Sequence, residues 1–232
     1  MTPPVSATRS PSVTLAVLAG GRGSRMGQAK GGLVIAGEPI LRRLHRRLGW
    51  QGPTLLVTAI GRERPPGCEL FGCECQDAVA DEGPLRGVHT ALTHSRPGDV
   101  VMLPVDMPRV EAAHLRWLAG QLASRPEVLG VLVRRPDGGV EPLPLAIRTT
   151  AVDVVGERLA TGRRSVRQLA EVPGFAIVDA PGDWPANVWD DLDTPADVEQ
   201  FHATSAANGG GGKGSVDITP PPAPPPPPGT GR

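Results

Sequence analysis

A glycine-rich, basic loop directly after an apolar run is the feature that most constrains this fold. The apolar run covers residues 13–17, and the loop at residues 18–30 reads LAGGRGSRMGQAK. Its four glycines lack a Cβ, so their backbone N–H groups are free to approach an anion closely. Arg22, Arg25 and Lys30 place cationic donors beside them. The pattern predicts a buried strand followed by a loop that cradles phosphate groups.

This loop differs from three familiar phosphate-binding motifs. A dinucleotide-binding G-x-G-x-x-G that begins at Gly21 would require glycine where the chain has Met26. A P-loop requires G-K-[ST], but Lys30 follows Ala29. The distant catalytic motifs of a protein kinase are absent from the sequence. The loop is therefore a phosphate cradle of another type.

Apolar runs alternate with amphipathic stretches between residues 13 and 203. The apolar runs predict strands at residues 13–18, 54–59, 73–76, 100–104, 129–133, 142–147 and 176–178. The amphipathic stretches predict helices at residues 40–48, 85–93, 111–122, 150–159, 166–170 and 195–201. Because helices separate most of the strands, we expect a three-layer, Rossmann-like α/β fold with a mostly parallel central sheet.

The two ends of the chain differ in composition from this part. Residues 1–12 are rich in proline, serine and threonine, and residues 204–232 contain a glycine stretch followed by a proline tract. Neither end has the large apolar residues that ordering by burial requires, so we expect flexible ends around one domain at residues 13–203. The proline tract is typical of a linker, a fusion remnant or a ligand for a proline-binding module.

Composition argues against several classes of function. Lysine plus arginine and aspartate plus glutamate both number 24, so no global field favours nucleic acid or an anionic membrane. Aromatic residues make up 3%, which is too few for a base-stacking surface. No apolar run is long enough to span a membrane, and the N-terminal residues lack the apolar core of a secretory signal. We therefore expect a cytoplasmic protein.

Asp106 follows the apolar run at residues 100–104. The carboxyl ends of parallel strands meet at one edge of a sheet, so this carboxylate should face the glycine-rich loop there. Mg²⁺ binds one or two carboxylates together with substrate phosphate oxygens and water, which makes Asp106 a candidate metal ligand. Taken alone, an aspartate two residues before Pro108 fits a turn former or a helix cap equally well.

The loop resembles the signature L-A-[GA]-G-x-x-x-R-[ML]-G…K of nucleotidyltransferases that transfer NMP from an NTP. Within that superfamily the chain most resembles the molybdenum cofactor guanylyltransferases, because further landmarks follow in the order of that family. These are Asp77 followed by GPLRG at residues 83–87, VDMP at 105–108, Asn187, and DTPAD at 193–197. The resemblance spans residues 13–201.

The resemblance implies a role for each matching position. Asp106 would hold Mg²⁺, while Arg25 and Lys30 would neutralise the triphosphate during catalysis. Asp77 would accept hydrogen bonds from N1–H and the 2-amino group of guanine. The implied nucleotide-binding positions are Leu18, Ala19, Gly20, Gly21, Lys30, Asp77, Gly83 and Asp106.

Departures from the family pattern leave two questions open. The family stretch N-V-N-T-P-E-D is replaced by NVWDDLDTPAD at residues 187–197, so either Asn187 or Asp193 takes the C-terminal active-site position. Relatives often place a nucleotide-contacting asparagine where this chain has Ile60 and Gly61, and Ala29 replaces the usual residue before the lysine. The second question is therefore the choice of base.

The reaction implied by the resemblance is Mg²⁺-dependent transfer of GMP from GTP to the terminal phosphate of molybdopterin or Mo-molybdopterin, with release of pyrophosphate. Molybdopterin-inserting or molybdoenzyme chaperone proteins are the expected partners. The alternatives are a CTP-dependent molybdopterin cytidylyltransferase, a sugar-1-phosphate or 2-phospholactate nucleotidyltransferase, and a non-catalytic NTP-binding adaptor. The G-Q-x-K and D-x-D-T-P elements fit the cytidylyltransferase, whereas Gly20-Gly21 and the D-M-P triplet favour guanine.

Overall fold

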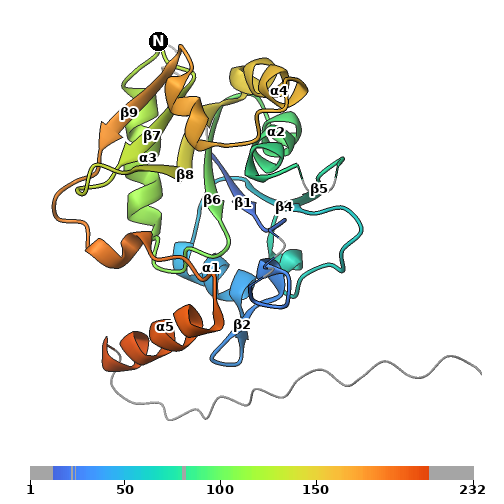
Figure 1. Ribbon diagram of the computed structural model, residues 1–232, viewed down its shortest axis with the longest axis vertical. Coiled ribbons are helices and arrows are strands. Elements are labelled where there is room, and N and C mark those ends of the chain that lie inside the picture. The colour runs from blue at the N-terminus through green and yellow to red at the C-terminus, as the bar shows by residue number, and fades with distance from the viewer. Residues whose placement is uncertain (1–12, 22, 24, 80–81, 209–232) are drawn as a thin grey trace, which may run out of the picture.

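The structure, a computed structural model, describes residues 13–21, 23, 25–79 and 82–208 of the 232-residue chain (Figure 1). The flexible end expected at residues 1–12, residues 209–232 of the one expected at 204–232, and Arg22 of the loop lie outside the described residues. The described part contains a seven-stranded sheet of order β5-β4-β1-β6-β8-β7-β9 and a separate two-stranded ribbon, β2-β3.

Each predicted strand is present, with small shifts at the ends. The strands of the main sheet are β1 (Thr14–Leu18), β4 (Thr54–Thr58), β5 (Cys73–Gln76), β6 (Asp99–Pro104), β7 (Gly130–Arg134), β8 (Val140–Arg148) and β9 (Phe175–Asp179). β1 pairs in parallel with β4 and β6, β4 with β5, and β7 with β9. The mostly parallel sheet expected from the sequence is confirmed.

Strand β8 runs against both of its neighbours, β6 and β7. A tight turn connects β7 to β8, in which the Arg135 amide donates to the Gly139 carbonyl at 2.8 Å. A connection this short has no room for a crossover helix, so the two strands must pair antiparallel. The turn residues RPDGG at 135–139 carry this signal in the sequence.

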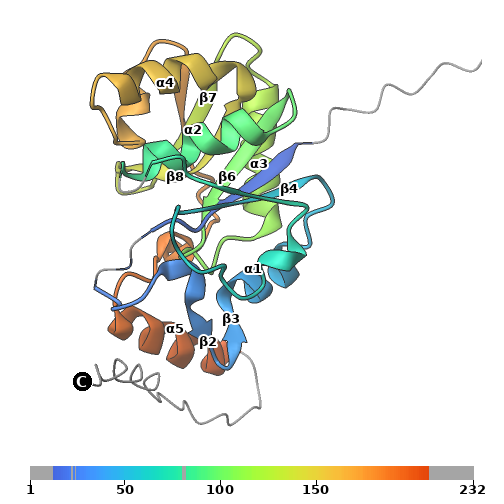
Figure 2. The same ribbon diagram turned by 90° about the vertical axis from the view of Figure 1, so that its right-hand side faces the viewer.

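The described residues form five α-helices, and the first four of them cover the two faces of the sheet (Figure 2). The five helices are α1 (Ile40–Leu48), α2 (Pro84–His94), α3 (Ala112–Ala123), α4 (Val152–Ala160) and α5 (Pro195–Asn208). Figure 2 shows α2 and α4 on one side of the sheet and α1 and α3 on the other. Leu44 of α1 and Leu115 of α3 belong to one apolar core, and Val88 of α2 and Val155 of α4 to a second. The sheet therefore separates two cores, as the alternating pattern predicts.

Three local differences from the sequence-based expectations have physical reasons. The helix expected at residues 166–170 is a 3₁₀ turn, Arg167–Glu171, which is too short to form an α-helix of its own. The ribbon of β2 (Val34–Ile35) and β3 (Glu38–Pro39) was not predicted, because each strand has only two residues. Helix α5 continues to Asn208, beyond both the expected helix end at residue 201 and the expected domain end at 203.

Strands β1, β4, β5 and β6 end at the same level along the sheet. Leu18 pairs with Val57 on one side and with Pro104 on the other. Thr58 pairs with Gln76 one strand further out. The loops after β1, β4, β5 and β6 therefore begin at the same edge of the sheet, where ligands of parallel α/β folds bind.

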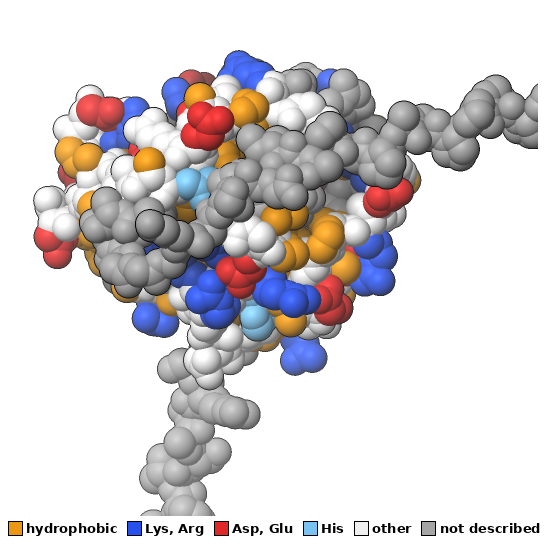
Figure 3. All heavy atoms as spheres, turned by 90° about the horizontal axis from the view of Figure 1, so that it is seen from below, with side chains coloured by type: hydrophobic (Ala, Val, Ile, Leu, Met, Phe, Trp, Pro, Cys, Tyr) orange, Lys and Arg blue, Asp and Glu red, His pale blue; other side chains and the backbone are white. Residues whose placement is uncertain are grey.

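The surface below the sheet carries charges of both signs. Figure 3 shows lysine and arginine side chains interspersed with aspartate and glutamate side chains on this face. The picture agrees with the equal totals of basic and acidic residues in the sequence. Among the helices that the structure describes, none is long and apolar enough to cross a membrane.

Candidate active site

The glycine-rich loop leaves β1 and closes on itself. The Ala19 amide still donates to the Val57 carbonyl at 2.8 Å, and the Lys30 amide returns to the Gly21 carbonyl at 3.4 Å. Gly23 has φ +56°, and a Cβ there would lie 2.0 Å from the Gln28 carbonyl oxygen. Only glycine fits this position, so the close return of the loop to Lys30 depends on the glycine at residue 23.

An open cleft of 490 Å³ lies between this loop and the ends of the strands. Seven of the eight nucleotide-binding positions expected from the sequence line it: Leu18, Gly20, Gly21, Lys30, Asp77, Gly83 and Asp106. The eighth, Ala19, is buried and lines a separate hollow behind the loop. Successive side chains of an extended chain point to opposite sides, so the Ala19 methyl group faces away from the cleft. Only its backbone remains a candidate for ligand contact.

Lys30 is the electrostatic centre of the cleft. Its ammonium contacts Oδ2 of Asp106 and Oδ1 of Asp193 at the same time. The Lys30 side chain is 18% exposed and that of Asp106 is 11% exposed, so water screens this group weakly. Burial alone would lower the pKa of Lys30, but Asp106 and Asp193 together hold that pKa above its ordinary value. Lys30 therefore stays charged across the physiological range.

Arg25 approaches the same cluster from the glycine-rich loop. Its Nη1 lies 3.4 Å from Oδ2 of Asp193, and its side chain is 74% exposed. This contact is long and solvated, so it contributes little to stability. The guanidinium is free to turn toward a bound anion. The structure thus brings together Lys30, Arg25 and Asp106, the three residues that the sequence analysis proposed as catalytic.

Of the two candidates for the C-terminal position, Asp193 is the one whose side chain contacts Lys30. Asn187 lies in a 3₁₀ turn (Ala186–Trp189) and is exposed. The Asp193 and Thr194 amides both donate to Oδ2 of Asp197, at 3.1 and 2.7 Å. This cap at the start of α5 fixes the backbone from which Asp193 points to Lys30.

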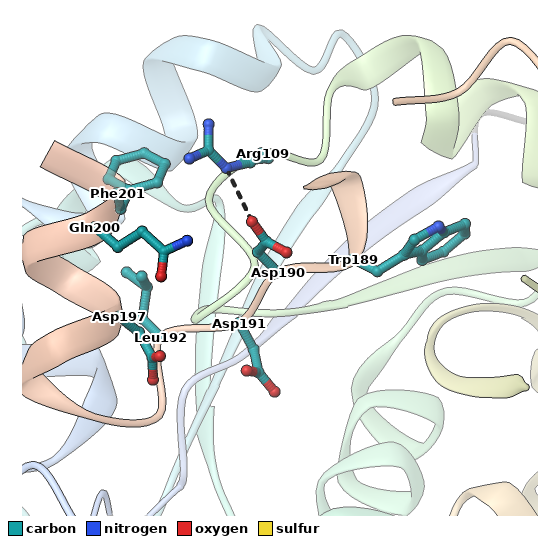
Figure 4. Close-up of a pocket in the computed structure, with 8 residues that line it drawn as sticks. All are labelled: Arg109, Trp189, Asp190, Asp191, Leu192, Asp197, Gln200 and Phe201. Carbon is teal, nitrogen blue, oxygen red and sulfur yellow. Dashed lines mark ion pairs between the residues drawn. The ribbon is translucent and has the colours of Figure 1, made fainter. Parts of the chain in front are cut away.

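Asp191 is a further acidic residue at this site that the sequence analysis did not select. Burial raises its pKa, and the negative charges of Asp193 and Asp106 raise it further. Figure 4 shows that Asp191 points away from Arg109, whereas Asp190 points toward it and pairs with it at 3.5 Å. The sequence DDLD at residues 190–193 could have indicated this role for Asp191. Alternate residues of an extended segment lie on the same side, so Asp191 and Asp193 share one side.

Asp77 lies at the opposite end of the cleft, directly after β5. Burial raises its pKa, while the Thr90 hydroxyl and the charge of Arg86 act in the opposite direction. Its Oδ1 is buried without a hydrogen-bond partner among the described residues. Its Oδ2 would lie 3.4 Å from a Cβ built on Gly20. A buried acceptor without a partner, beside a position with no side chain, is suited to receive the polar edge of a ligand.

Helix α2 begins at the wall of the same cleft. Its first residue is Pro84, preceded by Gly83 with φ +77° and ψ 179°, a conformation that essentially only glycine adopts. Gly83, Pro84 and Gly87 all line the cleft. Small residues here allow a ligand to approach the helix backbone closely.

A second hollow, of 240 Å³, lies behind Asp191 and is drawn in Figure 4. Arg109, Trp189 and Phe201 are among its lining residues. The guanidinium carbon of Arg109 lies 4.8 Å from the centre of the Phe201 ring, which helps hold α5 in place. Trp189 in turn contacts Trp184 at 5.6 Å between ring centres. These aromatic residues pack the C-terminal segment against the domain.

The carboxylates of the cleft fit a divalent cation shared with a ligand. Within the described residues, no three or more histidine, cysteine, aspartate or glutamate side chains form a complete metal cage. Asp106 and Asp193 instead converge on one cationic group, Lys30. Two carboxylates that leave the remaining positions to phosphate oxygens and water are the donor set that Mg²⁺ prefers.

A parallel sheet with a phosphate loop at its carboxyl edge, facing acidic residues across a cleft, defines a nucleotidyltransferase of the α/β class. The chain belongs to the MobA-like NTP transferase family, whose domain model matches residues 15–174. A probable molybdenum cofactor guanylyltransferase of Deinococcus radiodurans is 31% identical over 82% of this chain and 93% of that protein. The molybdenum cofactor guanylyltransferase of Pseudomonas aeruginosa strain PAO1 is 32% identical over 75% of this chain and 87% of that protein.

Solved structures confirm the fold. Molybdopterin-guanine dinucleotide biosynthesis protein A from Archaeoglobus fulgidus superposes with a TM-score of 0.69 at 20% identity, over 84% of this chain and all of that one. A protein named Rv0371C from Mycobacterium tuberculosis, crystallised as a complex with manganese, superposes with a TM-score of 0.53 at 18% identity. That match covers 83% of this chain and 99% of that protein. The fold therefore includes a protein that binds a divalent metal.

Proposed function

We propose that this protein transfers GMP from GTP to the terminal phosphate of molybdopterin or Mo-molybdopterin, forming a guanine dinucleotide cofactor and releasing pyrophosphate. The relatives named molybdenum cofactor guanylyltransferase, at about the same length, support the choice of reaction. The observation that carries the proposal is the Lys30 ammonium, which meets Asp106 and Asp193 at the mouth of a glycine-rich loop. This arrangement suits a polyphosphate and a divalent cation together.

The transfer requires no covalent enzyme intermediate. An oxygen of the acceptor phosphate forms a bond to the α-phosphorus of GTP, and the bond from that phosphorus to the pyrophosphate oxygen breaks. Lys30 and Arg25 neutralise charge on the phosphates, and the backbone of the glycine-rich loop orients them. Asp106 and Asp193 would hold Mg²⁺, which supplies further charge neutralisation when it is bound.

Asp77 supports guanine as the base. A carboxylate with a buried, unpartnered oxygen accepts from both N1–H and the 2-amino group of guanine. Cytosine offers only its 4-amino donor on that edge, so it would leave one carboxylate oxygen without a partner. The cytidylyltransferase remains the second candidate because the chain carries its G-Q-x-K and D-x-D-T-P elements.

The cellular setting follows from these substrates. A protein that consumes GTP acts where GTP is made, which favours the cytoplasm. Its product is a cofactor for other enzymes, so hand-over to a molybdopterin-inserting or molybdoenzyme chaperone protein stays a prediction.

Pyrophosphate release from GTP and from CTP, each with Mg²⁺ and with or without molybdopterin, tests the proposal. We expect release only with GTP and molybdopterin together. Preference for CTP would establish the cytidylyltransferase, and turnover with a sugar-1-phosphate or 2-phospholactate in place of molybdopterin would establish another acceptor. Tight GTP binding without turnover of any acceptor would favour the adaptor.

A further inference from the structure

The Lys30 ammonium pairs with Asp106 and Asp193, the two carboxylates that are best placed to hold a divalent cation. This ammonium touches one oxygen of Asp106 and one of Asp193. The Lys30 ammonium is thus the positive charge that lies between these two carboxylates, which would otherwise repel each other, while the exposed Arg25 contacts only Asp193, at 3.4 Å.

The residue between the two carboxylates is a lysine in a chain whose cationic residues are almost all arginines. The sequence contains only two lysines, Lys30 and Lys213, and its other cationic side chains apart from histidine are arginines. An ammonium is a compact point charge that takes the place of a metal ion between two carboxylates better than a planar guanidinium does. The cation between the two carboxylates is therefore a compact one, of the kind that a metal ion can replace.

We propose that Lys30 competes with the divalent cation for Asp106 and Asp193, and that the triphosphate opens the metal site by drawing the ammonium away. The inference deepens the proposed function and rests on it for the nucleotide. The Lys30 side chain already runs along Gly21, where a built Cβ would lie 3.5 Å from its Cδ. The ammonium therefore has a bound phosphate within reach by side-chain rotation alone, since Gly21 and Lys30 line the same cleft.

Two consequences follow from this competition. Without nucleotide the protein binds a divalent cation weakly, because the cation must first displace a charged and partly buried lysine. With nucleotide present, metal and triphosphate favour each other's binding by the same factor, because the coupling between two sites is reciprocal. The site thus loads metal and nucleotide together.

Mn²⁺ binding to the nucleotide-free protein, measured by electron paramagnetic resonance, tests the competition. We expect Lys30→Met to bind Mn²⁺ about tenfold more tightly than the wild type, a gain of about 1.4 kcal/mol. Lys30→Arg keeps the positive charge but presents a planar guanidinium, so its Mn²⁺ affinity should lie between those of the wild type and Lys30→Met. Lys30→Met with Asp106→Asn should lose the gain, which locates the site. Equal or weaker Mn²⁺ binding by Lys30→Met would overturn the proposal.

A second measurement uses the unaltered protein and does not depend on the folding of a variant. The Nζ resonance of Lys30 is followed by NMR, with Lys213 as a reference in the same chain. We expect Mg²⁺ alone to leave the Lys30 signal in place, and Mg²⁺ with GTP to shift it. Mg²⁺ binding to the nucleotide-free protein without any shift of the Lys30 signal would contradict the competition, because a bound cation must displace the ammonium from Asp106 and Asp193. Absence of GTP binding would instead refute the proposed function and leave the Mn²⁺ result intact, so the two failures are distinguishable.

Discussion

At the scale of single residues, the site depends on where each carboxylate points. Asp106 and Asp193 both face Lys30, whereas Asp190 turns outward to Arg109. Asp77 stands apart from them at the far end of the cleft, half-buried and with its Oδ1 lacking a hydrogen-bond partner among the described residues. The same side-chain type thus serves two proposed purposes, charge balance at the phosphates and recognition at the base, because its surroundings differ.

The role proposed for Asp106 predicts a large loss of activity without loss of the fold. Asp106→Asn removes a charge that would hold Mg²⁺, so we expect kcat to fall by about 100- to 1,000-fold. Steady-state pyrophosphate release and a thermal melt check the two parts separately. Asp190→Asn makes the same chemical change in a residue that faces Arg109, and should stay near wild-type activity. Unimpaired turnover in Asp106→Asn would remove Asp106 from the mechanism.

Asp77 predicts a pH-dependent stability difference. Because burial raises its pKa in the folded state, the folded protein holds this proton more tightly than the unfolded chain does. The ionised carboxylate therefore costs stability, a cost that appears as pH rises above 3.8 and is complete above the raised pKa. We expect Asp77→Asn to be more stable than the wild type at pH 7 and to converge with it in acid, as measured by urea unfolding.

Asp137 gives a control with the opposite sign. The Gly139 amide donates to its carboxylate and lowers its pKa, so ionisation of Asp137 favours the folded state. Asp137→Asn should therefore lose stability, relative to the wild type, as pH rises. A parallel response of the two variants would contradict the assignment for Asp77.

At the scale of elements, short connections decide the shape of the cleft. The loop after β1 returns to its own start, and the cap of α5 turns Asp193 toward it. The first turn of α2 forms the opposite wall. None of these pieces is long, and each depends on a residue with special backbone or capping chemistry. The element most sensitive to substitution should be the glycine-rich loop.

Two glycines of this loop allow a matched comparison. Gly23 and Gly27 both have positive φ, at +56° and +69°, so alanine at either position pays a similar backbone cost of about 1–2 kcal/mol. A Cβ at Gly23 would also meet the Gln28 carbonyl oxygen at 2.0 Å, whereas a Cβ at Gly27 meets no atom within 4 Å among the described residues. We expect Gly23→Ala to weaken GTP binding at least tenfold more than Gly27→Ala, as measured by calorimetry. Equal effects would show that loop closure at Gly23 does not position the nucleotide.

At the scale of the whole molecule, the sheet brings distant segments to one edge. The cleft draws lining residues from β1, the glycine-rich loop, β4, β6, β8 and the start of α2. A ligand that fills it ties these segments together and so stabilises the folded state as a whole. The expected effect is therefore a shift of the global melting temperature, not of one local segment.

The nucleotide preference should be visible in that melting temperature. A ligand at 100 times its Kd adds about 2.7 kcal/mol, which corresponds to about 5–11 °C for a domain of this size. With Mg²⁺ present we expect GTP to raise the melting temperature by an amount in this range, and CTP and ATP by much less. ITP, which lacks the 2-amino group, is the matched control and should fall between GTP and ATP. A larger shift with CTP than with GTP would reverse the proposed choice of base.

The amino-acid sequence by itself determined the order of strands and helices, the glycine-rich loop and the position of Asp106. These features follow from local periodicity, from glycine and proline positions, and from the rule that parallel strands end at one edge. The resemblance to the MobA-like family added the roles expected of Lys30 and Asp77.

Only the tertiary structure decided the pairing of β8 with β6, the contact of Asp193 rather than Asn187 with Lys30, and the approach of Asp191 to the site. Each of these depends on how segments far apart in the chain pack together. Residues 187–189 belong to a 3₁₀ turn and residues 190–193 lie outside any helix or strand, so the sequence pattern leaves open which side chain reaches Lys30. The Leu192 amide donates to the Asp106 carbonyl at 2.9 Å, and this contact sets the register that points Asp193 at Lys30. A hydrogen bond between such distant residues forms only when the domain folds around it.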